Sequence, residues 1–318
     1  MKILKFGGSS VSNAERIKGV IEIVKDAIRN NSSIIVVVSA QGGVTDTLEE
    51  LCRYTVIDYP RCAIIIEKLE SNTISILKSL LPIAQFPSAI AEIMAMINQL
   101  KDIVKGASLV GEVTSRTKDL IWSFGERLSA FVISEALKSE VSNATYTDAR
   151  KFIRTNDNYG YAKVDFDITN QFIQSYFAES NKLHVVTGFI ASATNGQTTT
   201  LGRSGSDYTA SIIGAALQAE AIEIWTDVDG VLTADPRFVD EAQSIAQLSY
   251  MEAMELSHFG AKVIFPATML PAMTKQVPIW VKNTFNPSHA GTCISQFSEK
   301  GNGFIKGITS LKNISLIN

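Results

Sequence analysis

The stretch KILKFGGSSVSNAERIKGVIEIVKDAIRNNSSIIVVV (residues 2–38) decides the fold class. It opens with a short apolar run that stops at a Gly-Gly-Ser-Ser turn, and it ends in a second apolar run typical of a buried parallel strand. Between them, Ser12 and Glu15 are spaced as in a capping box. One apolar stripe at helical spacing follows, formed by Ile17, Val20, Ile21, Val24 and Ile28. Strand, glycine turn, helix and strand within about forty residues predict one βαβ unit.

The rest of the chain repeats this alternation. Residues 45–105 are expected to be mostly helical, with breaks at Pro60, Pro82 and Pro87, and further helices are expected over 119–137 and 208–218. Strand-like segments recur at 144–147, 183–187, 222–226 and 279–283. Alternating helices and strands predict an α/β fold in three layers (αβα), with an open, mainly parallel sheet covered by helices on both faces.

Composition excludes several classes of protein. The 318 residues are 46% hydrophobic, enough for a substantial core in one large domain or two joined lobes. A formal net charge of -3 with 19% charged residues is unlike a nucleic-acid binder or a disordered chain. The three cysteines are far apart and match no zinc or disulfide pattern. No apolar run approaches the ~20 residues that span a bilayer. We expect a soluble cytoplasmic protein without nucleic-acid or membrane partners.

Glycine-rich turns open two of the expected helices. Lys5 and Gly7-Gly8-Ser9 stand where backbone N–H groups and a helix N-terminus can hold an anion, or they form a tight βα turn that requires glycine anyway. Neither the Walker pattern nor the dinucleotide fingerprint is present. The second turn is Thr200-Leu-Gly-Arg-Ser-Gly-Ser-Asp207, whose arginine suits a carboxylate or phosphate. Asp207 either takes part in chemistry or complements the helix dipole.

Two further acidic positions stand out. The segment Trp225-Thr-Asp-Val-Asp-Gly230 is delivered at the carboxyl end of an expected strand, where open α/β sheets bind ligands, although Asp-Gly also forms ordinary turns. Glu126 lies among apolar residues of a long helix, and a buried carboxylate needs a partner. That partner is either a ligand or Arg127, and a solvated face is the third possibility.

Together these segments resemble the aspartokinase branch of the amino acid kinase family. The stretches that carry the resemblance are Lys5-Phe-Gly-Gly-Ser-Ser-Val, Val38-Ser-Ala with Gly43-Val-Thr-Asp, Ser123-Phe-Gly-Glu-Arg-Leu-Ser-Ala, Thr187-Gly-Phe, Thr200-Leu-Gly-Arg-Ser-Gly-Ser-Asp-Tyr-Thr-Ala, Trp225-Thr-Asp-Val-Asp-Gly-Val, Asp235-Pro-Arg and Phe259-Gly-Ala-Lys-Val. They occur in the family's order across nearly the whole chain. The forms Trp225-Thr-Asp-Val-Asp-Gly and Met254-Glu-Leu-Ser-His-Phe-Gly-Ala-Lys are most similar to the kinase portion of bifunctional aspartokinase/homoserine dehydrogenases.

The resemblance implies a fold, an activity and roles for particular residues. The fold is of the carbamate kinase-like type, with an amino-terminal substrate lobe and a carboxyl-terminal nucleotide lobe. The reaction is ATP + L-aspartate to ADP + 4-phospho-L-aspartate, the first step towards threonine, methionine, isoleucine and lysine. The implied catalytic residues are Lys5 and Asp207. The implied aspartate-binding residues are Thr45, Glu126, Arg203 and Ser206. The implied nucleotide-binding residues are Gly7, Gly8, Ser9, Thr226, Asp227, Arg237 and Lys262. No protein metal site is implied, and Mg²⁺ is expected to be held mainly through nucleotide phosphates.

The sequence departs from the family pattern at two positions. Leu232 stands where many members have a tyrosine near the adenine, and Phe265 where a histidine is usual. Acetylglutamate, glutamate, carbamate and uridylate kinases are the alternatives within the fold, and a non-catalytic allosteric or assembly module is the alternative outside it.

The end of the chain is similar to the start of another domain. Residues 1–298 are expected to form the catalytic domain, and 299–318 a linker and the first strand of a truncated ACT-type regulatory region, through which the protein would form a homo-oligomer.

Overall fold

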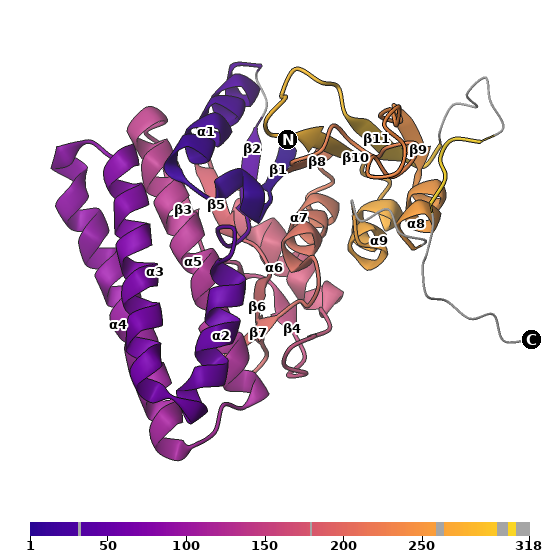
Figure 1. Ribbon diagram of the computed structural model, residues 1–318. Coiled ribbons are helices and arrows are strands. Elements are labelled where there is room, and N and C mark those ends of the chain that lie inside the picture. Colours follow the sequence, from indigo (N-terminus) through magenta and orange to yellow (C-terminus); the bar gives the residue numbers. More distant parts are fainter. Residues whose placement is uncertain (31–32, 179, 259–263, 298–304, 310–318) are drawn as a thin grey trace, which may run out of the picture.

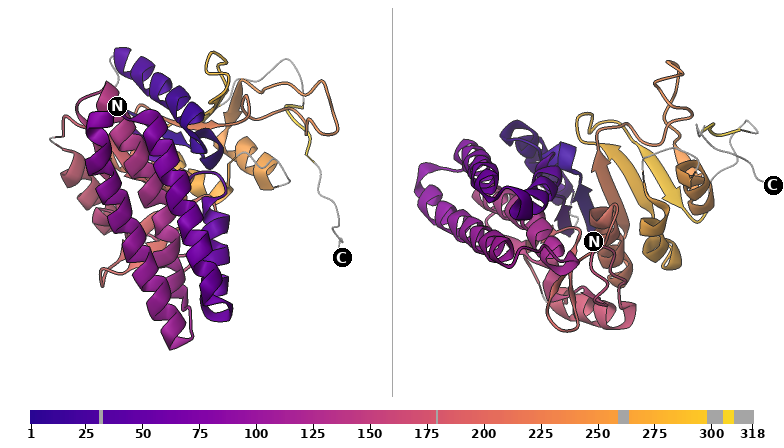
Figure 2. Two further views of the ribbon diagram at one scale, coloured as in Figure 1. Left: turned by 60° about the vertical axis from the view of Figure 1, so that its left-hand side comes forward. Right: turned by 60° about the horizontal axis from the view of Figure 1, so that its bottom comes forward.

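The computed structural model describes residues 1–30, 33–178, 180–258, 264–297 and 305–309. The chain folds around one large sheet, with a group of long helices projecting beyond it (Figure 1). The amino terminus lies near the middle of the sheet, beside β1 and β8, whereas the last described segments lie at the opposite end from the long helices (Figures 1 and 2).

The main sheet has eight strands among the described residues. In spatial order they are β3 (Ala144–Thr147), β5 (Leu183–Thr187), β2 (Ile34–Val38), β1 (Lys2–Phe6), β8 (Ala221–Thr226), β10 (Ile279–Asn283), β11 (Thr292–Ser295) and β9 (Gln247–Ser249). All neighbours pair in parallel except β10 and β11, which are antiparallel. The expected open, mainly parallel sheet is therefore confirmed.

Helices cover both faces of this sheet. Their bounds are α1 (Ala14–Arg29), α2 (Val44–Ile57), α3 (Tyr59–Leu80), α4 (Phe86–Val110), α5 (Ser115–Glu140), α6 (Phe166–Phe177), α7 (Gly205–Ala216), α8 (Tyr250–His258) and α9 (Pro266–Thr274). Short 3₁₀ helices are formed by Gly8–Val11, Ile83–Gln85 and Ala149–Lys151. The βαβ unit predicted from residues 2–38 is β1, α1 and β2, with β1 and β2 in parallel register.

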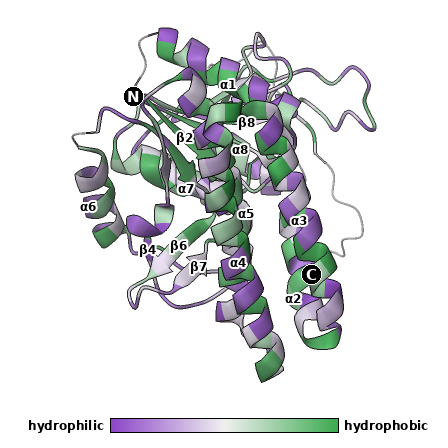
Figure 3. Cartoon of the chain, turned by 90° about the vertical axis from the view of Figure 1, so that its left-hand side faces the viewer, coloured by the Kyte–Doolittle hydropathy of each residue, from purple (hydrophilic) through white to green (hydrophobic). Residues whose placement is uncertain are grey.

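Alternation along the strands divides the core in two. On one face of the sheet, residues such as Leu4 and Val36 pack with α1 to α5; on the other, residues such as Ile3 and Ile35 pack with α6 to α9. Because successive side chains of a strand point to opposite faces, five consecutive buried residues in β2 supply both cores. In Figure 3, hydrophobic green runs along β2, while the long helices carry both colours, as expected of amphipathic helices.

The helix boundaries largely follow the sequence signals. Pro60 and Pro87 lie in the first turns of α3 and α4, where a missing backbone N–H costs nothing. The helix expected over 119–137 is longer, and the one expected over 208–218 begins earlier, at Gly205, inside the glycine-rich turn itself.

The predicted capping box at the start of α1 is wrong. Asn13, and not Ser12, caps the helix: its side-chain oxygen accepts a hydrogen bond from the backbone N–H of Arg16 at 2.9 Å. The Ser12 hydroxyl instead donates to the carbonyl of Ser9 at 3.3 Å, inside the preceding turn. The N-cap lies one residue later than predicted, and asparagine caps a helix as well as serine does.

A second, smaller sheet was not predicted. It consists of β4 (Arg154–Thr155), β6 (Ile190–Ala193) and β7 (Thr198–Thr200), and β7 packs against α5. Its strands are two to four residues long and carry threonine, serine and alanine, so they show little hydrophobic alternation.

Two other expectations concern the whole chain. Within the described ranges, no helix combines the length and the apolar character that crossing a bilayer requires. Most of the linker and strand expected at 299–318 lies outside the described residues, and the described part, 305–309, contains no strand. The division into a catalytic domain and a regulatory region stays a prediction.

The corrected cap generates a test. Asn13→Ala should lower the free energy of unfolding by about 1 kcal/mol, because an orphan N–H of the first turn loses its acceptor. Glu15→Ala is the matched control, and it should cost only a few tenths of a kcal/mol through the helix dipole. Urea denaturation of both variants measures the difference. Equal losses, or a larger loss for Glu15→Ala, would support the capping box instead.

Candidate active site

A cavity of about 620 Å³ opens at the carboxyl edge of the main sheet. It is lined by Lys5 at the end of β1, by the loop 39–43 that follows β2, and by Phe189 just after β5. These three strands are adjacent and parallel, so their carboxyl ends meet at one place, which is where open α/β sheets bind ligands.

Seven of the residues named from the sequence line this cavity. They are Lys5, Gly8, Thr45, Glu126, Arg203, Ser206 and Asp207. They come from β1, the turn after it, the first turn of α2, the middle of α5 and the start of α7. Positions up to two hundred residues apart in the chain thus share one cavity.

The Lys5 ammonium lies 2.5 Å from Asp207 Oδ1. Both side chains are mostly buried, with 10% and 12% of their surface exposed. Charges so far removed from water are maintained only when they are paired, and the pair leaves the ammonium at the cavity wall.

Two helices present their N-termini to the cavity. The first turn of α2 contributes Thr45 and Asp46, and the first turn of α7 contributes Ser206 and Asp207. Neither helix has a side-chain cap, in contrast to α1. Uncapped first-turn N–H groups and the positive end of the helix dipole both favour a bound anion.

Glu126 is the most deeply buried acid of the cavity wall, only 4% exposed. Its Oε1 accepts a hydrogen bond from the backbone N–H of Ala40 at 3.2 Å. Burial raises the pKa of Glu126 to about 8, although the Ala40 N–H and the charge of Lys5 act in the opposite direction. Without a bound cation, this carboxyl is therefore largely protonated at neutral pH.

The suggested pairing of Glu126 with Arg127 is wrong. The Arg127 Nη2 donates to Gln99 Oε1 at 2.9 Å, and its guanidinium lies over the ring of Phe124, 4.3 Å from the centroid. Among the described residues, no ion pair of Glu126 is found. A buried acid that faces a cavity without a cationic partner is suited to receive one from a ligand.

Arg203 reaches the same cavity from the turn before α7. It is exposed, forms no ion pair with any described residue, and lies 5.7 Å from the centroid of the Phe265 ring. An aromatic face attracts a guanidinium. Phe265, which replaces the usual histidine, can therefore stabilise Arg203 while its N–H donors stay free for a ligand.

The backbone around Arg203 is strained. Phe189 (φ 64°) and Ser204 (φ 54°) adopt left-handed conformations that side chains disfavour. Gly202 has φ 74°, and a Cβ there would lie 2.2 Å from Cδ2 of Tyr161, so only glycine fits. Such outliers concentrate at functional sites, where the surrounding packing must hold them in place.

The remaining predicted residues lie nearby or apart. Gly7 and Ser9 flank Gly8 but do not line the described cavity; the Gly7 N–H donates to the Trp225 carbonyl, and the Ser9 carbonyl accepts from Arg16 Nη1 at 2.7 Å.

The other residues assigned to the nucleotide lie at the end of β8, the strand next to β1 in the sheet, or after it in the chain. Thr226 ends β8, and its hydroxyl donates to Asp227 Oδ1 at 3.1 Å. Arg237 is exposed and pairs with Asp235, 2.6 Å away. Lys262 lies outside the described residues.

Sequence reasoning gave no site role to Trp122, to Phe189 or to the backbone N–H of Ala40, although Phe189 and Ala40 lie in stretches that carry the resemblance. Trp122 and Phe189 form one wall, with ring centroids 6.3 Å apart, and Lys118 Nζ lies 4.7 Å above the tryptophan. Trp122 stands four residues before Glu126, so the helical period placed it on the same face and could have identified it. The Ala40 N–H could not be found, because a backbone donor leaves no mark in the side-chain pattern.

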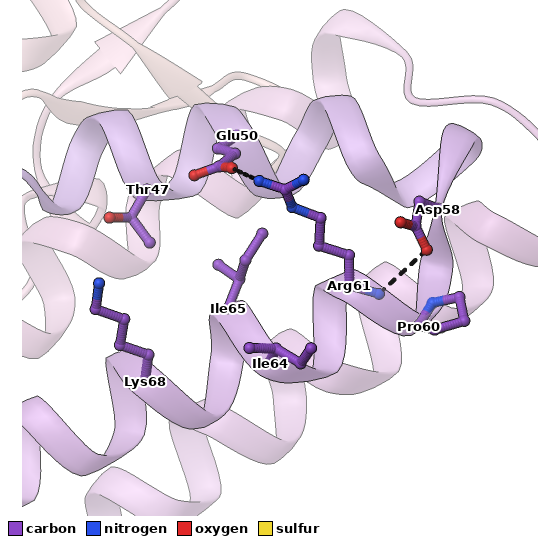
Figure 4. A pocket seen from close by; sticks show the side chains of 8 residues that line it. All are labelled: Thr47, Glu50, Asp58, Pro60, Arg61, Ile64, Ile65 and Lys68. Atoms are coloured by element: carbon purple, nitrogen blue, oxygen red, sulfur yellow. Dashed lines mark hydrogen bonds and ion pairs between the residues drawn. The ribbon is translucent and has the colours of Figure 1, made fainter.

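A second hollow, of about 560 Å³, lies between α2 and α3 and contains none of the predicted residues. Figure 4 shows two of its polar contacts: Arg61 Nη2 pairs with Glu50 Oε1 at 2.9 Å, and the Arg61 backbone N–H donates to Asp58, which caps α3. The Arg61–Glu50 pair thus joins α2 to α3.

The chain resembles known proteins along its length. It matches the amino acid kinase family over residues 1–283. It is 35% identical to the bifunctional aspartokinase/homoserine dehydrogenase of Buchnera aphidicola from Acyrthosiphon pisum, over 100% of this chain and 39% of that protein. It is 33% identical to the lysine-sensitive aspartokinase 3 of Escherichia coli, over 93% of this chain and 64% of that protein.

Solved structures agree with these matches. The crystal structure of E. coli aspartokinase III in complex with aspartate and ADP superposes with a TM-score of 0.85 at 31% identity, covering 94% of this chain and 65% of that one. The chain thus spans between 39% and 65% of the length of these relatives. Because the family match extends over residues 1–283, the chain belongs to the amino acid kinase family.

Proposed function

We propose that this chain catalyses phosphoryl transfer from ATP to the side-chain carboxylate of L-aspartate. The observation that carries the proposal is one cavity that joins the Lys5–Asp207 pair to Arg203 and to the buried, cation-free Glu126. The relatives are named aspartokinases, and one of their structures contains aspartate and ADP, which supports the same assignment.

The reaction needs charge neutralisation more than it needs a base. The side-chain carboxylate of aspartate has a reference pKa of about 3.9, so at neutral pH it is already an anionic nucleophile. Bringing it to a triphosphate opposes two like charges, and catalysis therefore rests on positioning and on nearby positive groups. Lys5 supplies an ammonium at the reacting phosphate, Asp207 orients it, and the first-turn amides of α2 and α7 add donors without a counter-ion.

Substrate recognition divides between the two ends of the amino acid. Arg203 offers a forked donor to the α-carboxylate, and Ser206 and Thr45 add hydroxyl groups near it. Glu126 receives the α-ammonium. The ammonium replaces the missing cation and makes the charged form of Glu126 favourable, so one buried acid discriminates aspartate from dicarboxylates without an amine.

The nucleotide side is proposed to use Gly7, Gly8, Ser9, Thr226 and Asp227, at the ends of β1 and β8, together with Arg237 and Lys262. No group of three or more metal-ligating side chains occurs in the part of the chain that the structure describes. We propose that Mg²⁺ arrives with ATP and is held mainly by its phosphates, as this ion often is. It supplies positive charge there when bound.

A cellular role follows from the proposal. The product, 4-phospho-L-aspartate, belongs to the biosynthesis of threonine, methionine, isoleucine and lysine, and we propose a cytoplasmic, homo-oligomeric enzyme.

A coupled assay that offers aspartate, acetylglutamate, glutamate, carbamate and uridylate with ATP separates the candidate functions. Turnover of another acceptor in place of aspartate would overturn the assignment.

The first test concerns Lys5. Lys5→Ala should lower kcat by about 10²-fold or more, because one preorganised positive group is lost from the reacting phosphate. Lys2→Ala is the matched control: it is in the same strand but pairs with Glu223 away from the cavity, and it should keep near-normal turnover. An unchanged kcat in Lys5→Ala would remove this residue from the mechanism.

The second test concerns Arg203. Arg203→Ala should raise KM for aspartate by roughly 30-fold, equivalent to about 2 kcal/mol for a lost charge-paired contact, and leave KM for ATP nearly unchanged. Arg116→Ala removes an exposed arginine from the first turn of α5 and serves as control. Weaker ATP binding with normal aspartate binding would reverse the assignment of Arg203.

The third test uses the pKa of Glu126. In the empty cavity this pKa is about 8, so the carboxyl holds its proton at pH 7. A bound ammonium lowers the pKa, so aspartate binding should release up to one proton, and affinity should rise between about pH 6 and 8 by at most tenfold per pH unit. Calorimetry in buffers of different ionisation enthalpy measures the release. Glu126→Gln should bind more weakly and release none; equal release from both proteins would contradict the role.

A further inference from the structure

Asp119 is a buried acid for which the proposed chemistry has no use. It lies on α5 about two helical turns before Glu126, and its exposed fraction is 0%. Burial raises its pKa, whereas hydrogen bonds from Gly160 and Thr200 oppose that rise. A buried carboxylate needs several hydrogen-bond donors, and the segments that supply them show which parts of the chain Asp119 connects.

All three donors belong to segments that reach the substrate cavity. Asp119 Oδ2 accepts from the backbone N–H groups of Gly160 and Thr200, each at 3.0 Å, and Oδ1 accepts from the Thr200 hydroxyl at 2.9 Å. A fourth bond joins the two segments, because the Ala162 N–H donates to the Thr200 carbonyl at 3.0 Å. One side chain thus connects α5, the loop around Gly160 and the end of β7.

Arg203 follows Thr200 by three residues, with Gly202 between them. The ring of Tyr161, next to Gly160, lies against the Gly202 backbone, so the two segments held by Asp119 also press on each other beside Arg203. Arg203 itself makes no ion pair with the described residues, and its guanidinium lies 5.7 Å from the centroid of the Phe265 ring. Its position is therefore determined by its backbone, which passes through the strained residue Ser204.

We propose that Asp119 is a positioning residue that sets the distance between Arg203 and Glu126, and thereby the specificity for an α-amino acid. Asp119 and Glu126 share one rigid helix, and Arg203 is tied to that helix through Thr200. The two groups proposed to hold the α-carboxylate and the α-ammonium are thus both positioned by α5. This inference rests on the proposed aspartate kinase function.

The chain provides a matched pair of substitutions within one strand. Thr199 and Thr200 are adjacent in β7 and both 0% exposed. The Thr200 hydroxyl donates to Asp119, whereas the Thr199 hydroxyl is hydrogen-bonded to Thr155 at 2.7 Å, on the other side of the strand. Valine has the shape of threonine without the hydroxyl, so each substitution removes one buried hydrogen bond, but only Thr200→Val weakens the connection to α5.

The experiment is steady-state kinetics on the complete polypeptide. Asp119→Ala removes the acceptor of two backbone N–H groups and of the Thr200 hydroxyl, and it should raise KM for aspartate about tenfold or more, with kcat lowered less than about threefold and KM for ATP unchanged. Thr200→Val should raise KM for aspartate by about threefold to tenfold, Thr200→Ser should restore it, and Thr199→Val should leave it within about twofold of the wild type.

The possible outcomes separate the two proposals. A uniform loss of activity in Thr199→Val and Thr200→Val, without a selective change in KM for aspartate, would reduce Asp119 to a folding role and overturn the inference. If Asp119→Ala does not fold, the threonine pair decides alone. A wild-type protein without aspartate kinase activity would refute the function itself; the KM comparison is then made with the acceptor that is turned over, and an unselective effect there overturns the positioning role.

Discussion

The ion pair between Lys5 and Asp207 joins the strand that opens the chain to a helix two hundred residues later, and the cavity depends on it. Lys5 is the last residue but one of β1, in the middle of the sheet, and Asp207 lies in the first turn of α7. Removing either partner would leave an uncompensated buried charge, which proteins rarely tolerate. The pair therefore fixes the start of α7 over the sheet edge, and with it the turn that carries Arg203.

Much of the fold follows from local patterns. The apolar runs of β1 and β2, the stripe of α1 and the prolines that begin α3 and α4 are signals within a few residues of the features they specify. The small sheet of β4, β6 and β7 has no such signal, because its short, polar strands are stabilised by contacts with α5 and by buried threonine hydroxyls. The cap of α1 was misplaced because Ser12 and Asn13 are equally good caps by sequence.

The candidate site divides in a similar way. Lys5, Glu126, Arg203 and Asp207 could be named because charged residues beside glycine-rich turns or within apolar surroundings are unusual, and because the resemblance gave them roles. The Ala40 amide, the left-handed backbone of Phe189 and the three bonds of Asp119 could not, since they depend on segments that meet only in three dimensions. What the sequence reveals is chemical identity; orientation comes from the tertiary structure.

The neutral carboxyl of Glu126 has a consequence for competition among metabolites. An amine-free dicarboxylate such as succinate can occupy the cavity while Glu126 keeps its proton, whereas aspartate must first displace that proton. Acidification of the surroundings would thus weaken the binding of aspartate, the proposed substrate, and leave that of the amine-free dicarboxylate unchanged. Selectivity would be sharpest on the alkaline side of neutrality and would erode as the medium turns acid, a property set by one buried side chain rather than by the shape of the cavity.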